Sequence, residues 1–175
     1  MRQGRRDGFR EFAAGRSGHL YRSACLLASG DTHLAEDLVQ ETLGRMYLMW
    51  GRISRIDNPA AYAQTVLVRA FLTHQRRRSA GERPVGEFPE QFTGPGAAAA
   101  GGADPALRLT LLEALGRLAP KDRAVLVLRY WEDRSVEETA DAMNVSSAAV
   151  RTRTSRALAR LREQLGGNLA EFAGL

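Results

Sequence analysis

The stretch SVEETADAMNVSSAAVRTRTSRALARLREQL, from Ser135 to Leu165, decides how the rest of the chain is interpreted. Its first part predicts a short helix, because apolar residues recur at helical spacing. These residues are Val136, Ala140 and Met143. Asn144 follows, and asparagine tolerates the left-handed backbone that a sharp turn requires. After this turn, Ser146 or Ser147 can cap a second helix.

The predicted second helix separates its side chains onto two faces. The apolar face consists of Val150, Ala157, Leu158, Leu161 and Leu165. Three basic residues at steps of three and four lie on the other face, namely Arg153, Arg156 and Arg160. A short helix, a tight turn and a basic second helix indicate a helix-turn-helix, whose second helix enters the major groove of DNA. The alternative is an ordinary helical hairpin with arginines on a solvated face.

Composition narrows the partners and the compartment. The net charge of +5 and the pI of about 10.1 favour a polyanionic partner, either nucleic acid or an anionic membrane. Cys25 is the single cysteine, so an internal disulfide is excluded and a reducing compartment is expected. The N-terminal MRQGRRDGF lacks the apolar core of a signal peptide, and no apolar run approaches the ~18 residues of a membrane span. We therefore expect a cytoplasmic protein.

The apolar periodicity predicts an all-α chain, with two small helical domains joined by a flexible linker. The first domain, residues 8–78, should follow a frayed lead-in over residues 1–7. Its expected helices run from about Phe9 to Ala28, from Asp31 or Thr32 to Trp50-Gly51, and from Pro59 to about Arg77. Ser, Gly, Pro and Ala dominate residues 79–105, as in a flexible linker. The second domain should span residues 106–170. Its first helix starts at Pro105 and is interrupted at Pro120, a second helix follows, and the helix-turn-helix comes last.

This arrangement resembles the sigma factors of the extracytoplasmic-function type, which are promoter-recognition subunits of bacterial RNA polymerase. Three stretches carry the resemblance. Ala35 to Thr42, AEDLVQET, is similar to region 2.2 of the family, and Asn58 to Tyr62, with the helix that follows, is similar to regions 2.3 and 2.4. Leu118 to Arg123 and Ser135 to Leu161 are similar to region 4. The arginine-rich style resembles the actinobacterial subgroup known as the SigE family.

The resemblance implies three sets of site residues. The second helix would bind core RNA polymerase through Asp37, Leu38, Gln40, Glu41, Leu43 and Met46. The third helix and the loop before it would recognise and melt the −10 element through Arg52, Arg55, Asp57, Asn58, Tyr62, Arg69, Arg76 and Arg77. The −35 element would be recognised by Ser147, Arg151, Arg153, Thr154, Arg156 and Arg160, with Arg153 as the strongest candidate for a guanine contact and Thr152 facing solvent.

Each assignment has a simpler alternative. The polar residues of the second helix could form a solvated face, and Tyr62 could be a core aromatic. Arg76 to Arg78 could lie on a solvated helix end, where positive charge also suits the helix dipole. Tyr62 also stands where the family usually has tryptophan.

Two other functions compete with the sigma-factor interpretation. The first is a stand-alone helix-turn-helix transcription regulator, which would bind duplex DNA without polymerase. The second is an enzyme, but the three histidines and the cysteine are widely separated and show no metal-ligand spacing or nucleophile motif. We therefore expect no catalytic residues, no metal and no cofactor. The expected partners are core RNA polymerase and promoter DNA, with an anti-sigma factor as a further candidate and no small-molecule substrate or membrane insertion.

Overall fold

The computed structural model describes residues 2–81 and 104–166, and within these ranges the regular secondary structure is entirely helical. The helices are α1 (Arg2–Leu27), α2 (Thr32–Ile53), α3 (Pro59–Ala80), α4 (Pro105–Gly116), α5 (Pro120–Leu126), the π-helical turn η2 (Val127–Trp131), α6 (Val136–Met143) and α7 (Ser147–Gln164). The predicted all-α fold is confirmed. Within the described ranges, no helix is both long and apolar enough to cross a bilayer.

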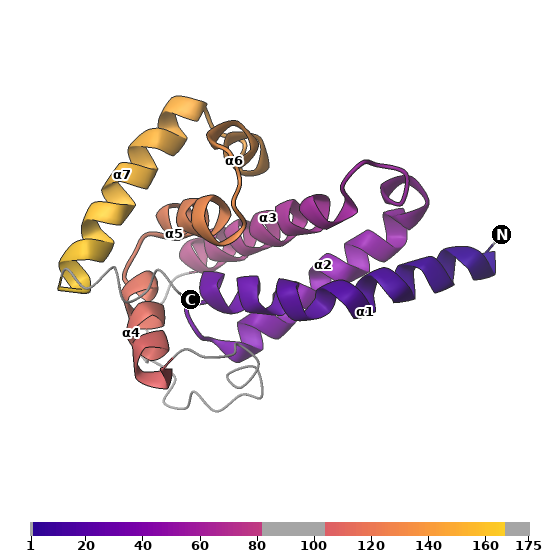
Figure 1. Cartoon of the computed structure of the whole chain (residues 1–175), viewed down its shortest axis with the longest axis horizontal. Coiled ribbons are helices and arrows are strands. Elements are labelled where there is room, and N and C mark those ends of the chain that lie inside the picture. The colour runs from indigo at the N-terminus through magenta and orange to yellow at the C-terminus, as the bar shows by residue number, and fades with distance from the viewer. Residues whose placement is uncertain (1, 82–103, 167–175) are drawn as a thin grey trace.

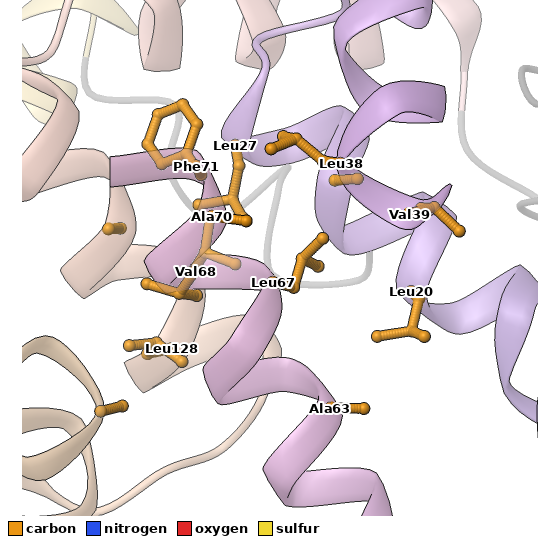
Figure 2. Close-up of a cluster of buried hydrophobic side chains, with 14 of the residues drawn as sticks. Leu20, Leu27, Leu38, Val39, Ala63, Leu67, Val68, Ala70, Phe71 and Leu128 are labelled. Atoms are coloured by element: carbon orange, nitrogen blue, oxygen red, sulfur yellow. The ribbon is translucent and has the colours of Figure 1, made fainter. Parts of the chain in front are cut away.

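Helices α1, α2 and α3 form a bundle in which each helix packs against the other two. The side chain of Asp31 caps α2 by accepting from the amide of Leu34, and Asn58 caps α3 by accepting from the amide of Ala61. Figure 2 shows Leu67 of α3 on the side that faces Leu20 of α1 and Leu38 of α2, and Phe71 near Leu27 at the end of α1. Leu67 and Phe71 are both fully buried. The bundle therefore holds α3 firmly, with one edge of that helix left for other contacts.

Helices α4 to α7 form a second unit with α5 at its centre. Helix α7 packs against α5 and α6, and lies on the far side of α5 from the α1–α3 bundle (Figure 1). A separate apolar cluster joins α4, α5 and α7. Its buried members are Ala114, Leu115, Leu118, Leu126, Ala157, Leu161 and Leu165.

The two units share one apolar core. Leu128 is fully buried in the same cluster as Val68 and Phe71, and Figure 2 shows it beside α3. Arg123 reaches across from α5, where it donates to the carbonyl oxygen of Leu27 at 2.6 Å. Burial lowers the pKa of Arg123 to about 10, which leaves the guanidinium charged at neutral pH. The second unit is thus seated on the bundle, with α6 against α3 and η2 against α1.

The predicted boundaries are mostly confirmed, and three are wrong. Residues 1–7 were expected to fray, but α1 begins at Arg2. Helix α2 continues past Trp50-Gly51 to Ile53, because Trp50 and Ile53 are both buried and extend its apolar face. Helix α3 continues beyond Arg77 to Ala80. The predicted linker, residues 79–105, falls largely on residues 82–103, which lie outside the described ranges.

Candidate nucleic-acid interface

The helix-turn-helix is built by local capping at each of its ends. Ser135 and Glu138 form a reciprocal capping box at the start of α6, and the hydrogen bonds from Ser135 lower the pKa of the Glu138 carboxyl. Asn144 ends α6 with φ 54° and ψ 50°, the left-handed conformation expected there. Ser146 then caps α7 by accepting from the amide of Ala149 at 3.1 Å, so the structure selects Ser146 over Ser147.

The first two turns of α7 expose a stripe of small and polar side chains. Val150 is fully buried against the rest of the unit and fixes the rotation of the helix. Ala148, Arg151, Thr152 and Ser155 are exposed on the opposite side, with Ser147 half-buried beside them. A stripe of this kind near the start of the second helix is the part that meets base edges in a helix-turn-helix. We call these five residues the α7 stripe.

Arg153 and Arg156 point away from the α7 stripe, toward a buried carboxylate on α5. Asp122 is fully buried, and its Oδ1 accepts from Arg153 Nη1 at 3.0 Å and from Arg156 Nη2 at 2.9 Å. Arg156 Nε also donates to Asp122 Oδ2, at 3.3 Å. This carboxylate therefore links the start of α5 to the middle of α7.

The electrostatics of this cluster favour its charged form. Burial raises the pKa of the Asp122 carboxyl, but the hydrogen bonds and charges of Arg156 and Arg153 lower it by more, so the pKa lies below its usual value. In return, the hydrogen bond and charge of Asp122 raise the pKa of Arg156. Asp122 lies in the stretch Leu118 to Arg123 that resembles region 4, but the sequence alone assigns it no role.

The predicted −35 residues therefore have different environments. Arg151 is exposed and lies 3.5 Å from Glu137, and Arg160 is also exposed. The Arg153 side chain is only 26 % exposed and holds Asp122, which does not suit it for a base contact in this conformation. Thr154 donates its hydroxyl to the carbonyl oxygen of Val150 at 2.7 Å. Thr152 faces solvent, as expected, and lies on the α7 stripe.

The predicted −10 residues lie on α3 and on the loop before it, except Arg52, which was expected in the loop but lies in the last turn of α2. Most of them are exposed, namely Arg52, Arg55, Asp57, Asn58, Arg69, Arg76 and Arg77. Tyr62 is partly buried and packs against the core, which is compatible with both of its proposed roles. Arg69 differs from the other arginines because its guanidinium donates to two main-chain oxygens of α6.

The predicted polymerase-binding residues divide between surface and core. Asp37, Gln40 and Glu41 are exposed, and Glu41 pairs with Arg45 at 2.6 Å. Leu38 and Met46 are 2 % and 0 % exposed, so they pack in the core behind α2 and do not present a surface to a partner. Leu43 is half-buried.

An apolar surface at the end of α2 was missed by the sequence analysis. It consists of Tyr47, Leu48, Met49 and Ile56, with Leu48 82 % exposed. Met49 continues the helical spacing of the buried residues Leu38, Thr42 and Met46, so hydrophobic periodicity alone gives no sign that it faces outward. Large apolar side chains exposed near one helix end are candidates for a protein interface.

The chain was compared with known families, proteins and structures. Residues 16–81 match the family described as Sigma-70 region 2, and residues 108–161 match Sigma-70, region 4. The RNA polymerase sigma-E factor of Streptomyces coelicolor is 40% identical over 157 residues, which are 90% of this chain and 85% of that protein. The RNA polymerase sigma factor CarQ of Myxococcus xanthus is 35% identical and covers 76% of this chain and 75% of its own. A crystal structure of the sigma factor RpoE of Bartonella quintana with the anti-sigma factor NepR has a TM-score of 0.69 and 25% identity, and covers 91% of this chain and 97% of that one.

Proposed function

The chain belongs to the sigma-70 family, among its extracytoplasmic-function sigma factors, and on that basis we propose which of its residues carry each part of the function. As such a sigma factor, it binds core RNA polymerase and directs initiation of transcription at specific promoters. The stand-alone regulator is set aside, since the chain matches region 2 as well as region 4. The chain itself carries out no chemical step and acts in the cytoplasm with the polymerase, where catalysis belongs to the core enzyme.

We assign region 2 to the α1–α3 bundle and region 4 to helices α4–α7. This keeps the predicted domains, residues 8–78 and 106–170, while α3 extends the first to Ala80 and Pro105 begins the second. Residues between them act as the connection, in the predicted linker 79–105. An anti-sigma factor is a further proposed partner, supported by the similarity to the Bartonella quintana protein, whose structure contains one.

The α7 stripe recognises the −35 element. The observation that carries this proposal is the exposure of Arg151, Thr152 and Ser155 at the start of a capped second helix whose other side is buried. Arg151 is suited to a guanine or phosphate contact, and Thr152 and Ser155 are short enough to let the helix approach the groove. Arg156 and Arg160 contribute phosphate contacts at the edge of the stripe, since both are exposed. Arg153 acts through Asp122 as a positioning residue for α7.

The −10 element is recognised by α3, the loop before it and Arg52 at the end of α2. Arg69, Arg76 and Arg77 supply charge along the helix, while the exposed residues Arg52, Arg55, Asp57 and Asn58 surround the melted strand. Tyr62 stacks on an unpaired base.

The polymerase docks on α2. The contact set is the polar group Asp37, Gln40 and Glu41, together with Leu43 and the exposed apolar surface at the end of the helix. An apolar centre beside polar residues is the usual composition of a protein interface.

Size-exclusion chromatography with bacterial core RNA polymerase, followed by transcription from a pool of genomic promoter fragments, tests this division of roles. The wild-type chain should comigrate with core and yield promoter-specific transcripts. Gln40→Ala combined with Glu41→Ala should weaken comigration, whereas Arg151→Ala should leave comigration intact and lower transcription about tenfold, a loss within the range of one bidentate base contact. Arg162→Ala, an exposed arginine of α7 outside the stripe, is the matched control. An equal loss in Arg151→Ala and Arg162→Ala would contradict the assignment of the stripe.

A further inference from the structure

Arg69 on α3 caps the C-terminal end of α6. The last carbonyl groups of a helix have no partners within the helix and lie at the negative end of its dipole. Arg69 Nε donates to the carbonyl oxygen of Ala142 at 2.9 Å, and its Nη2 donates to that of Asp141 at 3.0 Å. Region 4 therefore occupies hydrogen-bond donors of region 2 that a DNA phosphate would also require.

Arg134 makes the opposite connection, from region 4 to the same helix of region 2. Its guanidinium donates to the carbonyl oxygen of Ala61, to Gln64 Oε1 at 3.1 Å and to Thr65 Oγ1 at 3.2 Å. Ala61, Thr65 and Arg69 follow one another at steps of four residues, so they share one face of α3. Region 4 thus makes hydrogen bonds along about two turns of the helix that we assign to the −10 element.

Glu132 anchors this contact on α1 and α3. Its side chain is only 3 % exposed, and its carboxylate accepts from Ser23 Oγ and Gln64 Nε2. His19 Nε2 lies 2.9 Å from the same carboxylate, and the indole of the adjacent Trp131 donates to Ser23 Oγ at 3.1 Å. Water can satisfy these polar groups when the units separate, whereas separation also exposes the apolar core that the units share at Leu128.

We propose that region 4 inhibits the free chain by closing over the −10 face of α3, held there by Arg134 and by the capping of α6 by Arg69. This inference rests on the proposed role of α3 in −10 recognition. In the closed form the donors of Arg69 are engaged by α6, and Arg134 is bound to Ala61, Gln64 and Thr65 of α3. A ligand that binds only the open form has its apparent affinity reduced by the fraction of chains that are open. Polymerase and promoter therefore have to open the chain before α3 can act.

Arg134→Ala in the full-length chain tests the proposal, because Arg134 is outside the proposed DNA set. Small-angle X-ray scattering of the free chain measures opening directly, and we expect a larger radius of gyration than in wild type. Fluorescence anisotropy measures binding to a labelled single-stranded oligonucleotide, taken from the non-template −10 strand of a promoter that the wild-type holoenzyme transcribes. We expect binding to tighten at least about fivefold. Loss of a positive charge would by itself weaken DNA binding, so tighter binding points to opening.

Two further variants serve as a second test of the contact and as a control. Gln64→Ala removes one partner from both Arg134 and Glu132 and should reproduce the effect if Arg134→Ala fails to fold. Arg162→Ala removes an exposed arginine away from the contact and should leave scattering unchanged. Unchanged scattering and affinity in both Arg134→Ala and Gln64→Ala would overturn the closed form and leave the proposed function intact. Larger scattering without tighter binding would overturn the inhibition and also place −10 recognition elsewhere than on this face of α3.

Discussion

Replacing Asp122 by asparagine should destabilise the chain, because this buried carboxylate accepts three hydrogen bonds from two arginines. A hydrogen bond to a charged group contributes about 1.5–3 kcal/mol to stability. Asparagine keeps one acceptor oxygen but turns an NH₂ group toward the guanidinium groups in place of the other. The side chains of Arg153 and Arg156 are 26 % and 46 % exposed, so water can replace part of what is lost. We therefore expect the free energy of unfolding to fall by about 1.5–2 kcal/mol, toward the lower end of that range.

The pKa of the Asp122 carboxyl determines how the loss of stability in Asp122→Asn depends on pH. A carboxyl whose pKa is lower in the folded state contributes stability above its unfolded pKa, about 3.9, and loses that contribution as the pH falls through the folded value. The difference between wild type and Asp122→Asn should then be constant from about pH 5 to pH 8 and narrow below about pH 4.

Thermal and urea unfolding, followed by far-UV circular dichroism, measure the difference. For a chain of this length the loss corresponds to a fall in Tm of about 3–8 °C. Glu113→Gln, which neutralises an exposed carboxylate of α4, is the control and should change Tm little. A loss below about 0.5 kcal/mol, within the range of an ordinary surface substitution, or a difference that changes between pH 5 and pH 8, would refute the assigned role of Asp122.

Three other substitutions test the local structure, each by urea unfolding of the full chain. Asn144→Ala should cost about 1–2 kcal/mol, because alanine has to adopt the left-handed conformation at φ 54°, whereas Asn144→Gly should be tolerated; equal losses would argue against the turn. Ser135→Ala should cost about 0.5–2 kcal/mol by removing the capping box of α6, and Ser155→Ala, outside any cap, serves for comparison. Leu128→Ala should cost about 2–5 kcal/mol because it leaves a cavity where the two units meet, and a much smaller loss would show that this core is loosely packed.

The helix starts could be predicted from the sequence because their signals are local. The side chains of Asp31, Asn58 and Ser146 each accept a hydrogen bond from a backbone amide only three residues further along the chain. The turn at Asn144 is equally local, since the conformational tolerance of asparagine is a property of the residue. The same holds for the buried face of α7, which repeats at helical spacing.

The orientation of the arginines could not be predicted in this way. Periodicity places Arg153 and Arg156 on a face distinct from the apolar one, but it does not say whether that face meets DNA or another part of the chain. The partner that decides this, Asp122, is 31 residues away from Arg153. The contact between Arg69 and α6 spans 73 residues, and it depends on how two separately predictable units pack. Covalent neighbours carry no information about such contacts.

The placement of Asp122 also explains why region 4 should bind DNA weakly alone. Arg151 is the only arginine of the α7 stripe, and Glu137 lies 3.5 Å from it. Arg153 and Arg156 share their charge with a buried carboxylate, so they release fewer counterions from DNA than their number suggests. With the proposed sites, affinity for a promoter would come from several modest contacts made together, and the exposed arginines at the end of α3 would supply charge at the −10 element. A chain arranged in this way has little affinity for DNA when only one of its units can bind, which favours recognition of promoters in the presence of polymerase.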